Sequence, residues 1–136
     1  MAVYVVIGPP CGGKTTEAKR RMREGDIIVD ADLLAQALGS PSTHAHPAHV
    51  KALAAQARDF VTSKAPRQKC DVYIVSASPN AAKTIPHDTV IECIPTLTEC
   101  LARAKRRPAW TASAIREWFE KYVPGEEGSK LRSRRW

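Results

Sequence analysis

Short apolar runs alternate along this chain with longer segments in which apolar residues recur at helical spacing. Val3–Ile7 is nearly all β-branched, and a continuous apolar run of this length is typical of a strand buried on both faces of a parallel sheet. Similar short runs predict further strands at residues 26–29, 72–75 and 89–94. The pattern therefore predicts strands that follow one another through most of the chain.

Helices are predicted between and after these strands. Their expected ranges are about 14–23, 32–38, 48–63, 98–106 and 111–122, with Thr98 as the N-cap of the fourth. In the last helix, Ile115, Trp118 and Phe119 fall on one apolar face. Strands that alternate with helices predict an α/β fold with a parallel sheet and right-handed crossovers.

The length of 136 residues suits one domain with one hydrophobic core. Pro124-Gly125 ends the last predicted helix, so we expect a domain over residues 1–124 and a basic, flexible tail over 125–136. No apolar run approaches the roughly 18 residues of a membrane span. The first residues lack the pattern of a signal peptide, and the four cysteines form no C-x-x-C pair, so the expected location is the cytoplasm.

The net charge of +7 changes this picture because it is unevenly distributed. Residues 101–136 hold 10 of the 21 Lys and Arg residues but only four of the 14 Asp and Glu residues. A concentrated basic excess favours a polyanionic partner, such as a nucleic acid. A nucleoside triphosphate is the smaller alternative.

The segment Gly8–Thr15 matches the P-loop pattern G-x-x-x-x-G-K-[ST] at every fixed position. It lies between a predicted strand and a predicted helix, which is the context that the motif requires. We expect Lys14 to reach the β- and γ-phosphates of ATP and the Thr15 hydroxyl to bind Mg²⁺. The expected triphosphate site comprises Gly8, Pro9, Pro10, Cys11, Gly12, Gly13, Lys14, Thr15 and Thr16.

Two carboxylates follow the second predicted strand, in Asp30-Ala31-Asp32. If the strand geometry continues here, both side chains point to the triphosphate site. Transfer of a phosphoryl group to an alcohol needs a carboxylate that orients the hydroxyl and accepts its proton. Asp32 is the candidate for that base, and Asp30 is the candidate for Mg²⁺. The alternative is that Asp32 caps the next helix and that Asp30 is solvated.

Basic residues gather in the segment 103–107. Arg103 and Arg107 have the i, i+4 spacing of one helical face. Guanidinium groups that close over a transferring phosphoryl group stabilise its charge. The alternative is a solvated basic helix end.

These motifs together resemble the kinase domain of polynucleotide kinases, which are small P-loop kinases. The resemblance rests on the P-loop, on the Asp-containing turn and on the pattern Thr98-x₄-Arg103-x₃-Arg107 before a final helix. It implies a three-layer P-loop kinase fold, with a parallel sheet of four to five strands, helices on both faces and a short arginine-bearing lid. It also implies that Asp32 is the general base and that Arg103 and Arg107 are lid arginines.

Small single-domain phage kinases of this type include enzymes that phosphorylate 5-hydroxymethyluridine in DNA, and the chain is similar to them in size. Ala35 stands where polynucleotide kinases have an arginine that holds the acceptor, and Ser76-Ala77-Ser78 stands where an aspartate is common. The resemblance therefore implies transfer from ATP to a hydroxymethylated base in DNA. A 5′-hydroxyl end and a nucleoside or other small molecule are the alternatives.

A nucleotide-dependent ATPase switch is the alternative from another functional class. Such a protein needs a carboxylate at the end of the third strand, and Asp71–Ser76 has none at its carboxyl end. His44, His46 and His49 lie close together in sequence, and we interpret them as polar loop residues. A metal site, or a contact between one of them and a nucleic-acid backbone, is the alternative.

Overall fold

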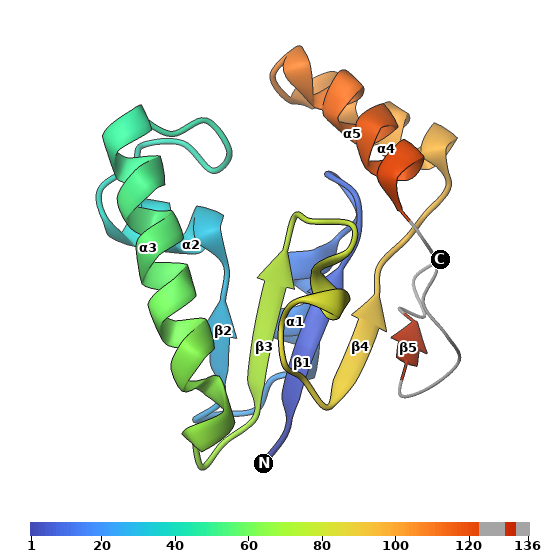
Figure 1. Ribbon diagram of the computed structural model, residues 1–136. Coiled ribbons are helices and arrows are strands. Elements are labelled where there is room, and N and C mark those ends of the chain that lie inside the picture. Colours follow the sequence, from blue (N-terminus) through green and yellow to red (C-terminus); the bar gives the residue numbers. More distant parts are fainter. Residues whose placement is uncertain (123–129, 133–136) are drawn as a thin grey trace.

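The computed structural model describes residues 1–122 and 130–132, which form a parallel sheet with helices on both faces (Figure 1). The strand order is β2-β3-β1-β4-β5, and every neighbouring pair is parallel. The carboxyl ends of the strands therefore meet at one edge of the sheet. The strands are β1 (Val3–Ile7), β2 (Ile27–Val29), β3 (Val72–Ser76), β4 (Thr89–Glu92) and β5 (Lys130–Arg132).

Five α-helices and three short 3₁₀ helices connect the strands. The α-helices are α1 (Lys14–Arg21), α2 (Ala31–Ala37), α3 (Ala48–Lys64), α4 (Leu97–Arg103) and α5 (Trp110–Lys121). The 3₁₀ helices are η1 (Ala65–Arg67), η2 (Ala81–Lys83) and η3 (Ala104–Arg106). Helices α4 and α5 lie beyond the carboxyl ends of the strands, opposite the segment that links α2 to α3 (Figure 1).

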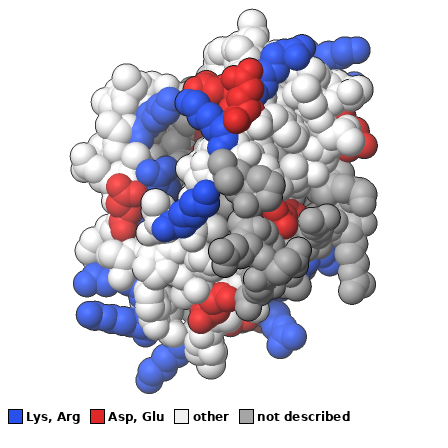
Figure 2. Space-filling model, turned by 45° about the vertical axis from the view of Figure 1, so that its right-hand side comes forward, with Lys and Arg blue, Asp and Glu red and all other residues white. Residues whose placement is uncertain are grey.

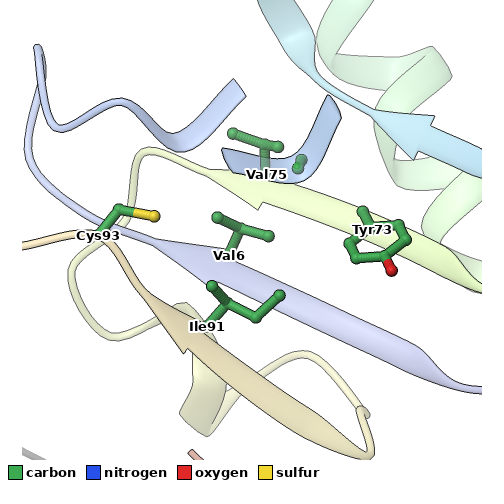
Figure 3. Close-up of a cluster of buried hydrophobic side chains, with 6 residues drawn as sticks. Val6, Tyr73, Val75, Ile91 and Cys93 are labelled. Carbon is green, nitrogen blue, oxygen red and sulfur yellow. The ribbon is translucent and has the colours of Figure 1, made fainter. Parts of the chain in front are cut away.

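Alternate residues of the strands pack on opposite faces of the sheet, as the period of two in a strand requires. On one face, Val6, Tyr73 and Ile91 form a buried cluster with Ala18 of α1 (Figure 3). On the other face, buried strand residues pack against α3, η1, η2 and the end of α5. The predicted three-layer α/β fold is therefore confirmed.

Both ends of the predicted fourth helix differ from the expectation. Its N-cap is Thr96 rather than Thr98, because the Thr96 side chain accepts a hydrogen bond from the Glu99 backbone N–H and Glu99 bonds back to the Thr96 backbone N–H. The α-helix ends at Arg103 and continues as η3. A capping box uses a residue three positions before the acidic one, which selects Thr96.

The predicted C-terminal tail is partly replaced by a strand. Lys130–Arg132 pair with Val90, Ile91 and Glu92 of β4 to form β5 at the edge of the sheet. The rest of the expected tail lies outside the described residues. Among the described residues, no helix has the length and apolar character needed to cross a membrane.

The lid consists of α4, η3 and α5, which pack together around a small core. This core contains the buried residues Cys100, Ala104 and Ile115, and Cys11 of the P-loop belongs to the same cluster. The lid is thus joined to the P-loop by apolar packing, and it lies directly beside the predicted triphosphate site.

Candidate active site

The P-loop follows β1 and leads into the first turn of α1. Two of its residues, Cys11 (φ 63°) and Gly13 (φ 82°), have left-handed backbone conformations, and Gly13 is the N-cap of α1. The Gly12 N–H donates to the Pro9 carbonyl at 2.9 Å, which closes the turn. This path places a helix N-terminus, with its positive partial charge, at the carboxyl edge of the sheet.

Gly8 and Gly12 lie against the backbone of the residue that follows β4. A Cβ atom on Gly8 would lie 2.2 Å from the Cys93 carbonyl oxygen, and one on Gly12 would lie 2.7 Å from the same atom. Real Cβ atoms essentially never come so close, and a backbone carbonyl cannot move aside as a flexible side chain can. The packing of the P-loop against Cys93 therefore requires glycine at both positions, whether or not a phosphate is bound.

Lys14 directs its ammonium group onto the P-loop itself. Its Nζ donates to the carbonyl oxygens of Gly8 and Pro9, each at 2.9 Å. Burial lowers the pKa of Lys14 to about 8, and the positive charge of Arg107 contributes to the lowering, whereas the charges of Asp30 and Asp32 oppose it. The two aspartates and the arginine that the sequence singles out are thus close enough to act electrostatically on the P-loop lysine.

Asp30 has two roles, one for each carboxylate oxygen. Its Oδ1 caps α2 by accepting hydrogen bonds from the backbone N–H groups of Asp32 (2.8 Å) and Leu33 (3.2 Å). Its Oδ2 accepts a hydrogen bond from the Thr15 hydroxyl. The alternative in which Asp32 caps the helix and Asp30 is solvated is wrong, since Asp30 is the cap and is only 5% exposed.

Thr15 and Asp30 have the donor chemistry that a Mg²⁺–triphosphate complex needs. Mg²⁺ is usually held in such sites by one or two protein oxygens together with phosphate oxygens and water. The hydrogen bond between the two side chains shows that a hydroxyl and a buried carboxylate converge beside the P-loop. These two residues therefore fit the ion, whose charge would offset that of the phosphates.

Asp32 lies in the first turn of α2, and its side chain is 48% exposed. Its Oδ1 lies 2.8 Å from His46 Nε2, and its Oδ2 lies 3.3 Å from His44 Nδ1. Asp32 is thus an accessible carboxylate with an imidazole beside each of its oxygens, next to a second carboxylate that is buried and engaged in capping.

The role of the histidines around Asp32 was not evident from the sequence. Sequence reasoning assigned His44 and His46 to a polar loop, and the structure places both against the candidate base. The only signal in the sequence is a pair of histidines separated by one residue, in a loop that follows the Asp-containing turn. Within the described part of the chain, no group of three or more His, Cys, Asp or Glu residues could hold a metal ion.

Arg103 and Arg107 do not share a helical face, contrary to the expectation from their spacing. Arg103 ends α4, whereas Arg107 follows η3 in an extended conformation (φ −114°, ψ 169°). Both nevertheless reach the site by different routes. Arg103 Nη1 donates to the Cys11 carbonyl oxygen at 3.0 Å, and Arg107 Nη1 lies 3.5 Å from His44 Nδ1.

The remaining residues of the predicted triphosphate site border the same loop. Pro9 is buried, Pro10 is half-buried and Thr16 is exposed on the first turn of α1. Trp110, next to the lid arginines in sequence, is 55% exposed. Figure 2 shows one face of the molecule, on which basic side chains border a hollow while acidic side chains lie nearby.

Comparison with solved structures identifies the architecture. The chain is similar to shikimate kinase from Acinetobacter baumannii in complex with shikimate, with a TM-score of 0.51 and 14% identity over 93% of this chain and 84% of that chain. It is also similar to TT1252 from Thermus thermophilus, with a TM-score of 0.56 and 14% identity over 96% of this chain and 87% of that chain. No family model and no curated protein matches the sequence. The comparisons show that the chain has the small P-loop kinase fold of shikimate kinase.

Proposed function

We propose that this protein is a Mg²⁺-dependent kinase that transfers the γ-phosphate of ATP to a hydroxyl group. The observation that carries the proposal is an accessible carboxylate that is joined to the P-loop through one neighbour. Asp32 is about half exposed, and its backbone N–H donates to the Asp30 carboxylate, whose other oxygen accepts a hydrogen bond from Thr15 of the P-loop. A base for an alcohol therefore lies beside the group that would hold the phosphates.

Each candidate residue has one role in the proposed reaction. The P-loop N–H groups and Lys14 bind the phosphates of ATP, and Asp32 orients the acceptor hydroxyl. The acceptor oxygen forms a bond to the γ-phosphorus, and the bond from that phosphorus to the β,γ-bridging oxygen breaks. The hydroxyl proton passes to Asp32, and ADP leaves with the bridging oxygen.

The lid arginines complete the proposed site from the other side. Arg103 is held at the P-loop by its bond to Cys11, and Arg107 acts electrostatically on Lys14. Guanidinium groups in such positions stabilise the negative charge on the transferring phosphoryl group. An ATPase switch would not need a base that is accessible to an alcohol, so the exposure of Asp32 favours the kinase.

A nucleic-acid acceptor is the finer proposal, with the hydroxymethyl group of 5-hydroxymethyluridine in DNA as the first choice and a 5′-hydroxyl end as the second. Its support is the exposed surface of the lid, where Trp110 follows the exposed residues Lys105 and Arg106 closely in sequence and is itself exposed. An exposed aromatic side chain beside basic residues suits base stacking and phosphate contacts. A base inside a duplex would need to be flipped out, at a cost of a few kcal/mol.

A small-molecule acceptor is the second candidate. The fold is similar to that of shikimate kinase, whose structure contains shikimate. Among the described residues, basic and acidic side chains are interspersed on the face drawn in Figure 2. A small hydroxylated acid or a nucleoside needs no extended basic surface.

The test is transfer of label from γ-labelled ATP to four acceptors. These are DNA with 5-hydroxymethyl pyrimidines, a 5′-hydroxyl oligonucleotide, free nucleosides and shikimate. We expect label in at least one acceptor, a loss of about 10²-fold or more in kcat with Asp32→Asn, and no change with the exposed control Asp59→Asn. Phosphate released only to water, at the same rate with and without acceptors, would overturn the kinase proposal.

A further inference from the structure

We propose, on the basis of the kinase function proposed above, that His46 is the positioning residue that holds Asp32 toward the acceptor. His46 lies between Ser40 and Asp32 and contacts both. Its Nδ1 is 2.6 Å from Ser40 Oγ, and its Nε2 is 2.8 Å from Asp32 Oδ1. The three side chains thus form one continuous hydrogen-bonded network, in the order Ser40, His46, Asp32.

Burial distinguishes His46 from the other histidines of this segment. The side chain of His46 is only 5% exposed and Ser40 is 8% exposed, whereas the His44 side chain is 33% exposed. His49 is exposed in the first turn of α3. A buried imidazole that bonds through both nitrogens is fixed in one orientation, and it passes that order to its partner.

The Asp32 carboxylate determines which atom donates in its contact with His46. An ionised carboxylate only accepts hydrogen bonds, so Nε2 carries the proton and donates to Asp32. Nδ1 faces the Ser40 hydroxyl, which can either donate to it or accept from it. Nε2 is therefore the donor to Asp32 whichever form the imidazole takes.

Asp32 and Ser40, at the two ends of this network, are both attached to α2. Asp32 lies in the first turn of α2, and the Ser40 N–H donates to the carbonyl oxygen of Ala35 at 3.0 Å, just after the helix ends. His46 therefore links the loop after α2 back to the start of that helix. The position of the Asp32 carboxylate is set by α2 and by a loop that is anchored to α2.

This arrangement assigns different roles to the two carboxylate oxygens of Asp32. Oδ1 is occupied by the buried His46, whereas Oδ2 faces the more exposed His44 at a longer distance of 3.3 Å. Oδ2 is thus the oxygen that meets the acceptor hydroxyl and takes its proton. His46 holds the base in place and does not itself accept the proton.

Two substitutions at His46 separate its two contacts. The side-chain amide of Gln reaches the place of Nε2, so His46→Gln keeps a donor toward Asp32. The shorter amide of Asn reaches only the place of Nδ1, so His46→Asn loses that donor. We expect His46→Asn to lower kcat about 10- to 100-fold with ATP affinity within about twofold of wild type, and His46→Gln to restore most of that loss.

His49→Gln is the matched control. We expect it to leave kcat unchanged, since the exposed His49 side chain lies outside the network of Ser40, His46 and Asp32. Equal losses of kcat in His46→Gln and His46→Asn would overturn the positioning role, because only one of them keeps the donor. A loss that follows a fall in melting temperature in both variants would overturn it as well.

A measurement of the imidazole nitrogens tests the contact without any acceptor. In long-range ¹H–¹⁵N NMR spectra of the full chain, we expect His46 to carry its proton on Nε2, and this proton resonance to move upfield in Asp32→Asn. A proton on Nδ1 alone, or a resonance that Asp32→Asn leaves unchanged, would overturn the inference. If the contact is found but no acceptor is phosphorylated, the proposed kinase function fails and the placement of Asp32 by His46 stands.

Discussion

At the scale of single residues, Lys14 shows how the fold prepares a cation for an anionic ligand. Its ammonium group is held by two P-loop carbonyl oxygens, while burial lowers its pKa to about 8. A triphosphate would stabilise the protonated form and so raise this pKa again. Binding of ATP is therefore coupled to proton uptake at alkaline pH.

We predict that ATP affinity falls as the pH rises above about 8. The protein without ATP then loses the Lys14 proton, and binding must restore it, so the dissociation constant increases by up to about tenfold per pH unit. Calorimetry in buffers of different ionisation enthalpy should record uptake of a proton at pH 9 and little uptake at pH 6.5.

The control for this prediction is Lys19→Met, which removes an exposed lysine of α1 and should leave the pH dependence intact. Equal ATP affinity at pH 7 and pH 9.5 in the wild-type protein would contradict the assignment of the titration to Lys14.

Gly12→Ala should abolish ATP binding and destabilise the protein. The added Cβ would lie 2.7 Å from the Cys93 carbonyl oxygen and 2.8 Å from that of Pro9, so the loop must move. Overpacking of this kind costs about 1–3 kcal/mol. Thermal unfolding and ATP titration measure the two effects.

Gly25→Ala separates backbone strain from the site. Gly25 has a φ of +92° and no atom within 4 Å of an added Cβ, so alanine there is strained but not crowded. We expect this variant to lose about 1 kcal/mol of stability and to bind ATP as tightly as wild type. Normal ATP binding by Gly12→Ala would show that the P-loop tolerates the displacement.

At the scale of secondary-structure elements, the cap of α4 gives a stability test with a built-in control. Thr96→Ala removes the side chain that accepts from the Glu99 N–H, and should cost about 1 kcal/mol. Thr98→Ala changes an exposed residue inside the first turn of the helix and should cost less than about 0.5 kcal/mol. Urea unfolding of both variants compares them directly, and equal losses would refute the cap assignment.

The elements themselves were largely predictable because their signals are local. Short apolar runs predict β1, β3 and β4, and helical spacing predicts α3 and α5. Each of these signals is contained within a few neighbouring residues. The end of α4 was not predictable in the same way, since its change into η3 breaks the spacing of Arg103 and Arg107. Nor was β5, whose residues read as a polar, basic segment with no apolar pattern.

The candidate site was predictable only where a motif fixes the backbone. The P-loop pattern determines its own path, and Asp30 and Asp32 follow directly from the end of β2. His46 approaches Asp32 across 14 residues of sequence through an irregular loop. No periodicity describes such a loop, so its contacts depend on tertiary structure alone.

At the scale of the whole molecule, the distribution of charge bears on the acceptor. The net charge is +7, yet acidic side chains lie among the basic ones on the face drawn in Figure 2. A nucleic-acid acceptor would be bound partly by release of counterions from its phosphates. A small acceptor would bind with little dependence on salt.

For a duplex DNA acceptor we predict that KM rises between 50 and 200 mM salt by about 3.5-fold for each phosphate contacted. Arg106→Gln should reduce this dependence, because it removes an exposed charge of the lid. The salt dependence of KM for the oligonucleotide and for a small acceptor, measured side by side, distinguishes the two. A KM for the oligonucleotide that does not change with salt would contradict phosphate recognition by the lid.

The contact of Gly8 and Gly12 with the Cys93 carbonyl has a consequence for the evolution of this fold. Selection to keep the strands packed would preserve both glycines even in a descendant that had stopped using nucleotides. Lys14 and Thr15 are held by hydrogen bonds to P-loop carbonyls and to Asp30 rather than by close packing, and other side chains could replace them without a steric clash. Among distant relatives, the loss of the lysine and the threonine, rather than of the glycines, would therefore mark the proteins that had abandoned the chemistry.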